Sequence, residues 1–123
     1  SPITQQEAKT TLQSSSNLAS NNPNVLPILI TGAANTILAT SALSTCTVMT
    51  YGSANITDHG ICWKTSAMPT ISDSVDSLGA LATASSFNTT LSGLTTGTTY
   101  YARAYVTTAN GTSYGNEITF TTL

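Results

Sequence analysis

Charged residues are scarce in this chain. Its 123 residues include 3 lysines and arginines and 5 aspartates and glutamates, so charged side chains make up 7% of the sequence. An average soluble domain carries about 25%. The formal net charge is −2. Because nucleic acids and anionic membranes are bound through basic surfaces, we expect neither of them as a partner.

The sequence also lacks the patterns that carry most catalysis and metal binding. It has no run of about 18 apolar residues, so we expect no membrane insertion. The two cysteines, Cys46 and Cys62, are too few for a tetrahedral zinc site. His59 directly follows Asp58, but neighbouring strand residues point to opposite faces and do not form an acid–base pair. We therefore expect no catalytic residues, no metal and no cofactor, and predict that the protein is not an enzyme.

Asp73 and Asp76, in the segment SDSVDS, are the remaining candidates for a metal site. Calcium takes about six to eight oxygen ligands, and this segment offers mostly hydroxyl and carbonyl groups. We expect a solvated loop here rather than a calcium site.

Alternating residues that suit β-strands are present instead. In the clearest run, every second residue from Tyr100 faces one side of a strand, and the residues between face the other side. The first set is Tyr100, Ala102, Ala104 and Val106, and the second is Tyr101, Arg103 and Tyr105. The second set is an outward stripe and a candidate ligand or partner face. The alternative is ordinary cross-strand packing on the outside of the sheet.

The residues that precede this strand, LSGLTTGTT, predict a tyrosine corner. A leucine and a short turn containing Gly97 lead into Tyr100. The ring of this tyrosine is expected to pack inward, while its hydroxyl bonds back to nearby backbone.

Further strands are expected at residues 25–30, 42–51, 57–64, 85–91 and 117–121, with a short edge strand within 65–76. The dipeptide Asn110-Gly111 predicts a hairpin. Cys46 alternates in step with the inward residue Val48, whereas Cys62 lies between the inward residues Ile61 and Trp63 and should point outward. The two cysteines are therefore expected on different sides of the third strand's sheet, which argues against a disulfide. Together these patterns predict an all-β fold, a seven-stranded antiparallel sandwich. Its expected core residues include Trp63, Phe87, Tyr100, Ile118 and Phe120.

Three motifs carry a resemblance to a known family: ITDHGICWKTSAMPTISD, LSGLTTGTTYYARAYV and ANGTSYGNEITFTT. Through them residues 27–123 resemble a fibronectin type III-like domain of bacterial secreted and cell-surface proteins. The resemblance implies that Trp63 and Tyr100 are core residues and that Asn110-Gly111 lies between the last two strands. It also implies a spacer, an adhesion module or a carbohydrate-associated domain, and no catalysis.

The chain departs from this family before and within its first strand. Residues 1–24 form a polar N-terminal extension or linker, which is either a flexible leader or a segment docked on a neighbouring subunit. The first strand is apolar on both faces, and its outer face is covered either by the extension or by another copy. The candidate self-association residues are Val25, Leu26, Ile28, Leu29 and Ile30.

These observations favour a non-enzymatic structural protein that is extracellular or on the cell surface. We expect copies of the sandwich to self-associate through the extension and first strand, and an extension lying along a neighbour's sheet edge would propagate into filaments. The alternatives are an adhesion or carbohydrate-binding module and a spacer domain of a larger surface protein. A binding module would use the stripe around Arg103 or residues 110–114, with a glycan or another surface protein as its partner.

Overall fold

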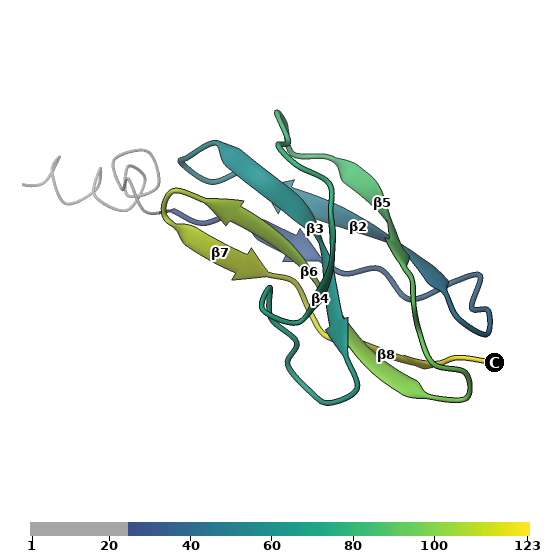
Figure 1. Cartoon of the computed structure of the whole chain (residues 1–123). Coiled ribbons are helices and arrows are strands. Elements are labelled where there is room, and N and C mark those ends of the chain that lie inside the picture. The colour runs from purple at the N-terminus through teal and green to yellow at the C-terminus, as the bar shows by residue number, and fades with distance from the viewer. Residues whose placement is uncertain (1–24) are drawn as a thin grey trace, which may run out of the picture.

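Two antiparallel sheets face each other in the computed structural model, which describes residues 25–123 (Figure 1). The first sheet has the strand order β1-β2-β5, and the second has the order β4-β3-β6-β7, with β8 also paired to β6. The strands are β1 (Ile28–Ile30), β2 (Ala42–Thr50), β3 (Ile56–Lys64), β4 (Ser74–Ser77), β5 (Ser86–Leu91), β6 (Thr99–Thr108), β7 (Gly111–Tyr114) and β8 (Ile118–Thr121). No helix in this part of the chain has the length and apolarity needed to cross a bilayer. The predicted β-sandwich is confirmed.

The structure has one strand, β7, that was not predicted. β7 and β8 both pair with β6, but with different parts of it. The pairing of β7 begins at Tyr105↔Tyr114, and the pairing of β8 ends at Ala102↔Ile118. The sequence pattern predicted the hairpin at Asn110-Gly111 and the strand that corresponds to β8, but not β7 as a strand of its own. The short edge strand predicted within residues 65–76 is β4, which pairs with β3.

Alternation along β2 and β5 builds one wall of the core. Ser44 and Cys46 point inward opposite Thr89 and Phe87, and all four side chains are buried. The buried Thr89 hydroxyl donates a hydrogen bond of 2.8 Å to the Ser44 carbonyl, so its polar group has a partner. Trp63, Phe87, Tyr100 and Phe120 lie in the core, and Ile118 is partly buried against it.

The turn before β6 is a tyrosine corner, as predicted. The backbone N–H of Thr95 donates a hydrogen bond of 2.8 Å to the Tyr100 hydroxyl. The Tyr100 ring is buried and stacks on Phe120 with ring centroids 5.9 Å apart. Gly97 has a φ of 58°, a left-handed conformation that glycine adopts without strain. This corner ties the loop to the strand that occupies the centre of the second sheet.

Candidate interaction site

The first strand presents apolar side chains to solvent. Leu29 faces the core, whereas Ile28 and Ile30 on either side of it are 60% and 46% exposed. Val25 and Leu26 precede the strand and are half-buried. The predicted outer apolar face therefore exists, and residues 25–123 leave it exposed to solvent. The predicted extension of residues 1–24 lies outside the described residues.

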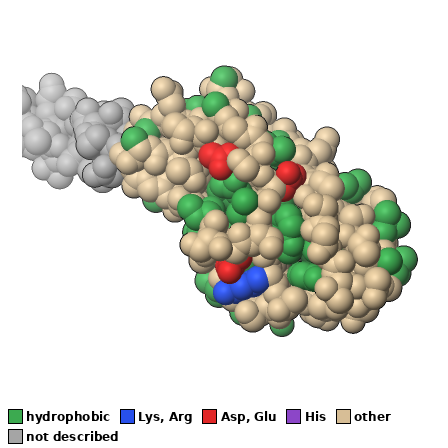
Figure 2. Space-filling model, viewed as in Figure 1, with side chains coloured by type: hydrophobic (Ala, Val, Ile, Leu, Met, Phe, Trp, Pro, Cys, Tyr) green, Lys and Arg blue, Asp and Glu red, His purple; other side chains and the backbone are tan. Residues whose placement is uncertain are grey.

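The outer face of the β1-β2-β5 sheet carries no charge. Every charged side chain of the described chain belongs to the second sheet or to its connecting segments, namely Asp58, Lys64, Asp73, Asp76, Arg103 and Glu117. The outward residues of the first sheet are Ile28, Ile30, Leu43, Thr45, Thr47, Met49, Ser86, Asn88 and Thr90. We call this surface the uncharged face. Even on the side of the molecule shown in Figure 2, charged side chains are few and hydrophobic ones lie among uncharged polar groups.

Side chains cap both edges of the first sheet. At the β1 edge, the Ser113 hydroxyl donates a hydrogen bond of 2.7 Å to the Pro27 carbonyl. At the β5 edge, the backbone N–H of Thr90 donates one of 2.9 Å to Oδ2 of Asp76. These contacts occupy backbone groups that an added strand would need. The geometry therefore favours contact through the uncharged face over strand addition along an edge.

The predicted ligand stripe on β6 points outward, but only part of it is accessible. Tyr101 and Arg103 are half-buried, and the expectation that Tyr105 is exposed is wrong, because 2% of that residue is accessible. Its hydroxyl donates a hydrogen bond of 2.8 Å to Oδ2 of Asp58. A Cβ at Gly60 would clash with the backbone carbonyl of Asp76 in β4 and would lie 3.2 Å from Tyr105 Cε1, so the glycine allows both β4 and the ring to pack closely here. Burial, reinforced by the Asp58 carboxylate, raises the pKa of Tyr105 well above its ordinary value.

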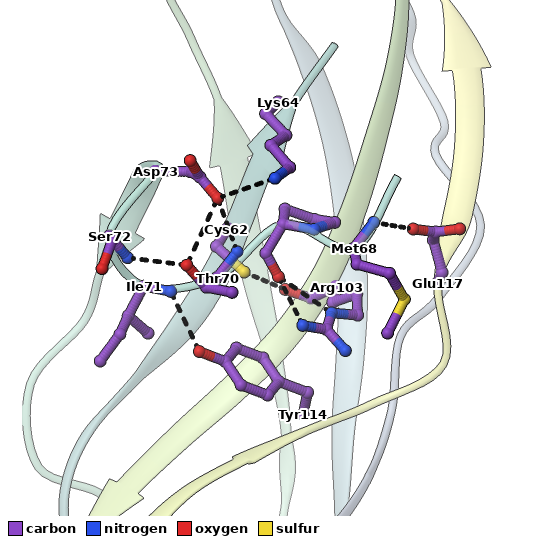
Figure 3. Close-up of polar contacts among 11 residues, drawn as sticks. Cys62, Lys64, Met68, Thr70, Ile71, Ser72, Asp73, Arg103, Tyr114 and Glu117 are labelled. Atoms are coloured by element: carbon purple, nitrogen blue, oxygen red, sulfur yellow. Dashed lines mark hydrogen bonds and ion pairs between the residues drawn. The ribbon is translucent and has the colours of Figure 1, made fainter. Parts of the chain in front are cut away.

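Arg103 is committed to contacts within the chain. Its Nε and Nη2 atoms both donate to the Pro69 carbonyl, at 3.0 and 2.7 Å. Its guanidinium carbon lies 4.0 Å from the centroid of the Tyr114 ring, in a cation–π contact. The loop of residues 65–73, which joins β3 to β4, is thereby folded over the outside of the second sheet (Figure 3).

Three further contacts fix the same loop, which we call the anchored loop (residues 65–73). The backbone N–H of Ile71 donates a hydrogen bond of 3.1 Å to the Tyr114 hydroxyl, and that of Met68 donates to Oε2 of Glu117. The Asp73 carboxylate accepts one of 2.8 Å from the backbone N–H of Thr70. The sequence pattern predicted a loop with a short edge strand over residues 65–76, but not the contacts that anchor the loop. The available signal was a pair of large apolar residues, Met68 and Ile71, in an otherwise small and polar segment.

The two cysteines are free, buried and on different sides of their sheets, as strand parity predicts. Cys46 belongs to the core between the sheets. Cys62 lies on the outer side of β3, where its Sγ donates to the Arg103 carbonyl at 3.4 Å. Burial raises the pKa of the Cys62 thiol to about 11, although the nearby Arg103 charge acts in the opposite direction.

His59 and Asp58 point to opposite faces, as predicted. Nδ1 of His59 lies 2.6 Å from the Gly79 carbonyl, and its ring meets Phe87 edge-on with centroids 4.7 Å apart. Oδ1 of Asp58 accepts hydrogen bonds from the Ser77 hydroxyl at 2.7 Å and the backbone N–H of Gly79 at 3.0 Å. Both side chains hold the segment after β4 in place.

The carboxylates first considered for calcium serve as backbone acceptors. Asp73 caps Thr70 within the anchored loop and lies 3.7 Å from the Lys64 ammonium, while Asp76 caps the β5 edge. Over residues 25–123, no three His, Cys, Asp or Glu side chains lie close enough together to hold a metal ion.

Comparison with known proteins identifies the fold. No family model matches the sequence, and a search of curated proteins found no match. The sensor domain of the anti-sigma factor RsgI4 of Pseudobacteroides cellulosolvens is similar in structure, with a TM-score of 0.57 and 20% identity over 84% of this chain and 97% of that domain. The fourth fibronectin type III domain of a human protein has a TM-score of 0.58 and 17% identity, covering 83% of this chain and 82% of its own.

A fibronectin type III domain from the human KIAA0970 protein is also similar, with a TM-score of 0.51 and 14% identity over 90% of this chain and 81% of that domain. Sequence identities this low show similarity of fold alone. The chain has a fibronectin type III-like fold, which confirms the fold that its motifs predicted.

Proposed function

We propose that this protein is a non-enzymatic structural protein of the extracellular space or the cell surface, whose copies associate through the uncharged face. The observation that carries the proposal is the exposure of Ile28, Ile30 and Met49, at 60%, 46% and 54%, on a sheet without a charged residue. Residues 1–24 precede β1 in the sequence, and we expect this extension to take part in the contact.

Burying the uncharged face costs little in desolvation. Its central hydroxyls already have partners within the sheet: Thr45 donates to Oδ1 of Asn88 at 2.9 Å, and Thr47 lies 3.0 Å from the Ser86 hydroxyl. A hydroxyl that already has a hydrogen-bond partner loses little free energy when it is desolvated, whereas an unpaired polar group is costly to bury. Apolar area removed from water contributes about 25 cal/mol per Å². A low net charge also adds little repulsion between copies.

Three features support an extracellular location. The motifs resemble those of bacterial secreted and surface proteins, and fibronectin type III domains share the fold. A surface rich in hydroxyl and amide groups, with few charges, suits an assembled protein. The third feature is the structural similarity to the sensor domain of the anti-sigma factor RsgI4, which is a second kind of module built on such a sandwich.

The binding-module alternative receives less support from the geometry. Of its three stripe residues, Tyr105 is buried and Arg103 is held by Pro69 and Tyr114. Tyr101 is the remaining candidate. Glycan-array binding that disappears in Tyr101→Ala would favour this alternative, and repeats of the same motifs in a longer parent chain would favour a spacer.

Size-exclusion chromatography with multi-angle light scattering tests the proposal on the full chain. Wild type is expected to run as oligomers, and Ile28→Thr/Ile30→Thr as a monomer of 12.7 kDa. Threonine preserves strand propensity, so the variant is expected to fold. The matched control is Val75→Thr/Leu78→Thr, which changes side chains 38% and 40% exposed on and beside β4 and should assemble like wild type. A wild-type chain that is monomeric at every concentration would contradict the proposal.

A further inference from the structure

Four side chains bind backbone groups of the anchored loop. Arg103, Glu117 and Asp73 each bind a backbone group of this loop, and Tyr114 binds another. Three of the six charged side chains of the described chain thus bind the backbone of one loop (Figure 3).

The backbone of this loop is also strained. Met68 has a φ of 61°, in the left-handed region that a long side chain rarely adopts. Such a conformation persists where surrounding contacts determine it, and such residues cluster at active sites, ligand clamps and switch regions. Here the contacts are those of Glu117 with Met68 and of Arg103 with Pro69.

The loop displays apolar side chains to solvent. Met68 is 56% and Ile71 42% exposed, and Figure 3 shows the Ile71 side chain pointing away from the polar contacts. Residues 68–72 carry no charge, and the neighbouring charged groups are turned toward the loop backbone. A loop that is already ordered loses little conformational entropy on binding. A methionine adapts its shape to the surface that it meets.

We infer that the anchored loop of one copy docks on the uncharged face of the next. This inference rests on the proposed function and names the partner of its contact surface. The uncharged face and residues 68–72 of the loop carry no charge, and Asp73 at the end of the loop is already paired with Lys64, so bringing the surfaces together leaves no ion unpaired. They lie on the outer sides of opposite sheets, so a single copy cannot bring its own loop to its own face. The contact is therefore between copies.

A contact between unlike surfaces has a structural consequence. Each copy keeps one free loop and one free face after binding a neighbour, so head-to-tail addition continues into a filament unless the rotation closes a ring. A face-to-face contact, in contrast, would be symmetric and would stop at a dimer.

A mixing experiment separates these arrangements. The face variant is Ile28→Thr/Ile30→Thr, and the loop variant is Met68→Asn/Ile71→Thr, in which asparagine tolerates the positive φ. Each variant alone is expected to be monomeric. Mixed in equal amounts, they should form a dimer of twice the monomer mass and nothing larger, because one copy supplies an intact loop and the other an intact face.

The outcomes distinguish this inference from the function on which it rests. If the loop variant assembles like wild type while the face variant is monomeric, or if the mixture stays monomeric, the inference is overturned and the proposed function stands. If wild type is monomeric, both fail. Thermal unfolding by circular dichroism verifies that each variant is folded.

Disulfide trapping provides a second test that needs no loss of assembly. A chain with Ile30→Cys is mixed with a chain carrying Met68→Cys and oxidised in air. The expected product is the mixed disulfide in several-fold excess over either homodimer. An excess of the Ile30→Cys homodimer would instead indicate a face-to-face contact and overturn the inference.

Discussion

The side-chain amide of Asn116 binds both backbone polar groups of Thr31. Its Oδ1 accepts a hydrogen bond of 2.8 Å from the Thr31 N–H, and its Nδ2 donates one of 3.2 Å to the Thr31 carbonyl. The Thr31 hydroxyl in turn accepts a hydrogen bond of 2.8 Å from the backbone N–H of Ala104 in β6. These contacts join the end of β1 to the second sheet at the interruption between β7 and β8.

Replacing Asn116 should therefore destabilise the sandwich. Asn116→Ala leaves the Thr31 N–H and carbonyl without partners, and we expect the free energy of unfolding to fall by about 1–3 kcal/mol. Urea unfolding followed by circular dichroism measures the change. The control is Asn88→Ala, which loses an exposed hydrogen bond to Thr45 and should cost less than about 0.5 kcal/mol. An equal decrease in the free energy of unfolding in the two variants would contradict the stabilising role of Asn116.

The tyrosine corner yields a matched pair of variants at adjacent positions. Tyr100→Phe removes the acceptor of the Thr95 N–H, and we expect it to lower the free energy of unfolding by about 1–2 kcal/mol. Tyr101→Phe removes a hydroxyl that has no hydrogen-bond partner in the described chain, so it should have little effect. If thermal unfolding showed the two variants to be equally stable, the corner would have no energetic role.

The carboxylate of Asp58 makes stability depend on pH. Burial by itself raises its pKa, but hydrogen bonds from Ser77, Tyr105 and Gly79 outweigh burial and leave the pKa below its usual value. A folded-state pKa below the unfolded one stabilises the protein above about pH 3.9, and this contribution is lost as the pH falls through the folded-state pKa.

We therefore expect the free energy of unfolding to fall more steeply between about pH 5 and pH 2 in wild type than in Asp58→Asn. Tyr105→Phe, which removes one of the hydrogen bonds, should give an intermediate slope. Denaturant titrations at a series of pH values provide the measurement. Identical slopes in wild type and Asp58→Asn would show that this group makes no contribution.

The thiol of Cys62 should be unreactive in the folded protein. Burial raises its pKa to about 11, so little thiolate exists at neutral pH, and Cys46 is fully buried as well. With Ellman's reagent at pH 8 we expect slow labelling of the native chain and prompt labelling of both cysteines in urea. Rapid labelling of one native thiol, located by mass spectrometry, would contradict the buried position of that residue.

Much of the fold could be predicted because strand alternation is a local signal. The burial pattern of β5 follows directly from its alternating residues, with Phe87, Thr89 and Leu91 inward. The same parity separates Cys46 from Cys62 and sets Asp58 against His59. The tyrosine corner was also predictable, since Thr95 and Tyr100 are close in sequence and joined by one short turn.

The accessibility of the outward side chains depends on contacts between distant residues. Alternation correctly turned Tyr105 outward, but Asp58 and the anchored loop cover the outside of the second sheet and leave only part of the stripe accessible. The hydrogen bonds between Asn116 and Thr31 join residues 85 positions apart in the sequence, and no periodic pattern predicts them. Local patterns set the direction of each side chain along its strand, whereas exposure depends on what packs against that side chain after the whole chain has folded.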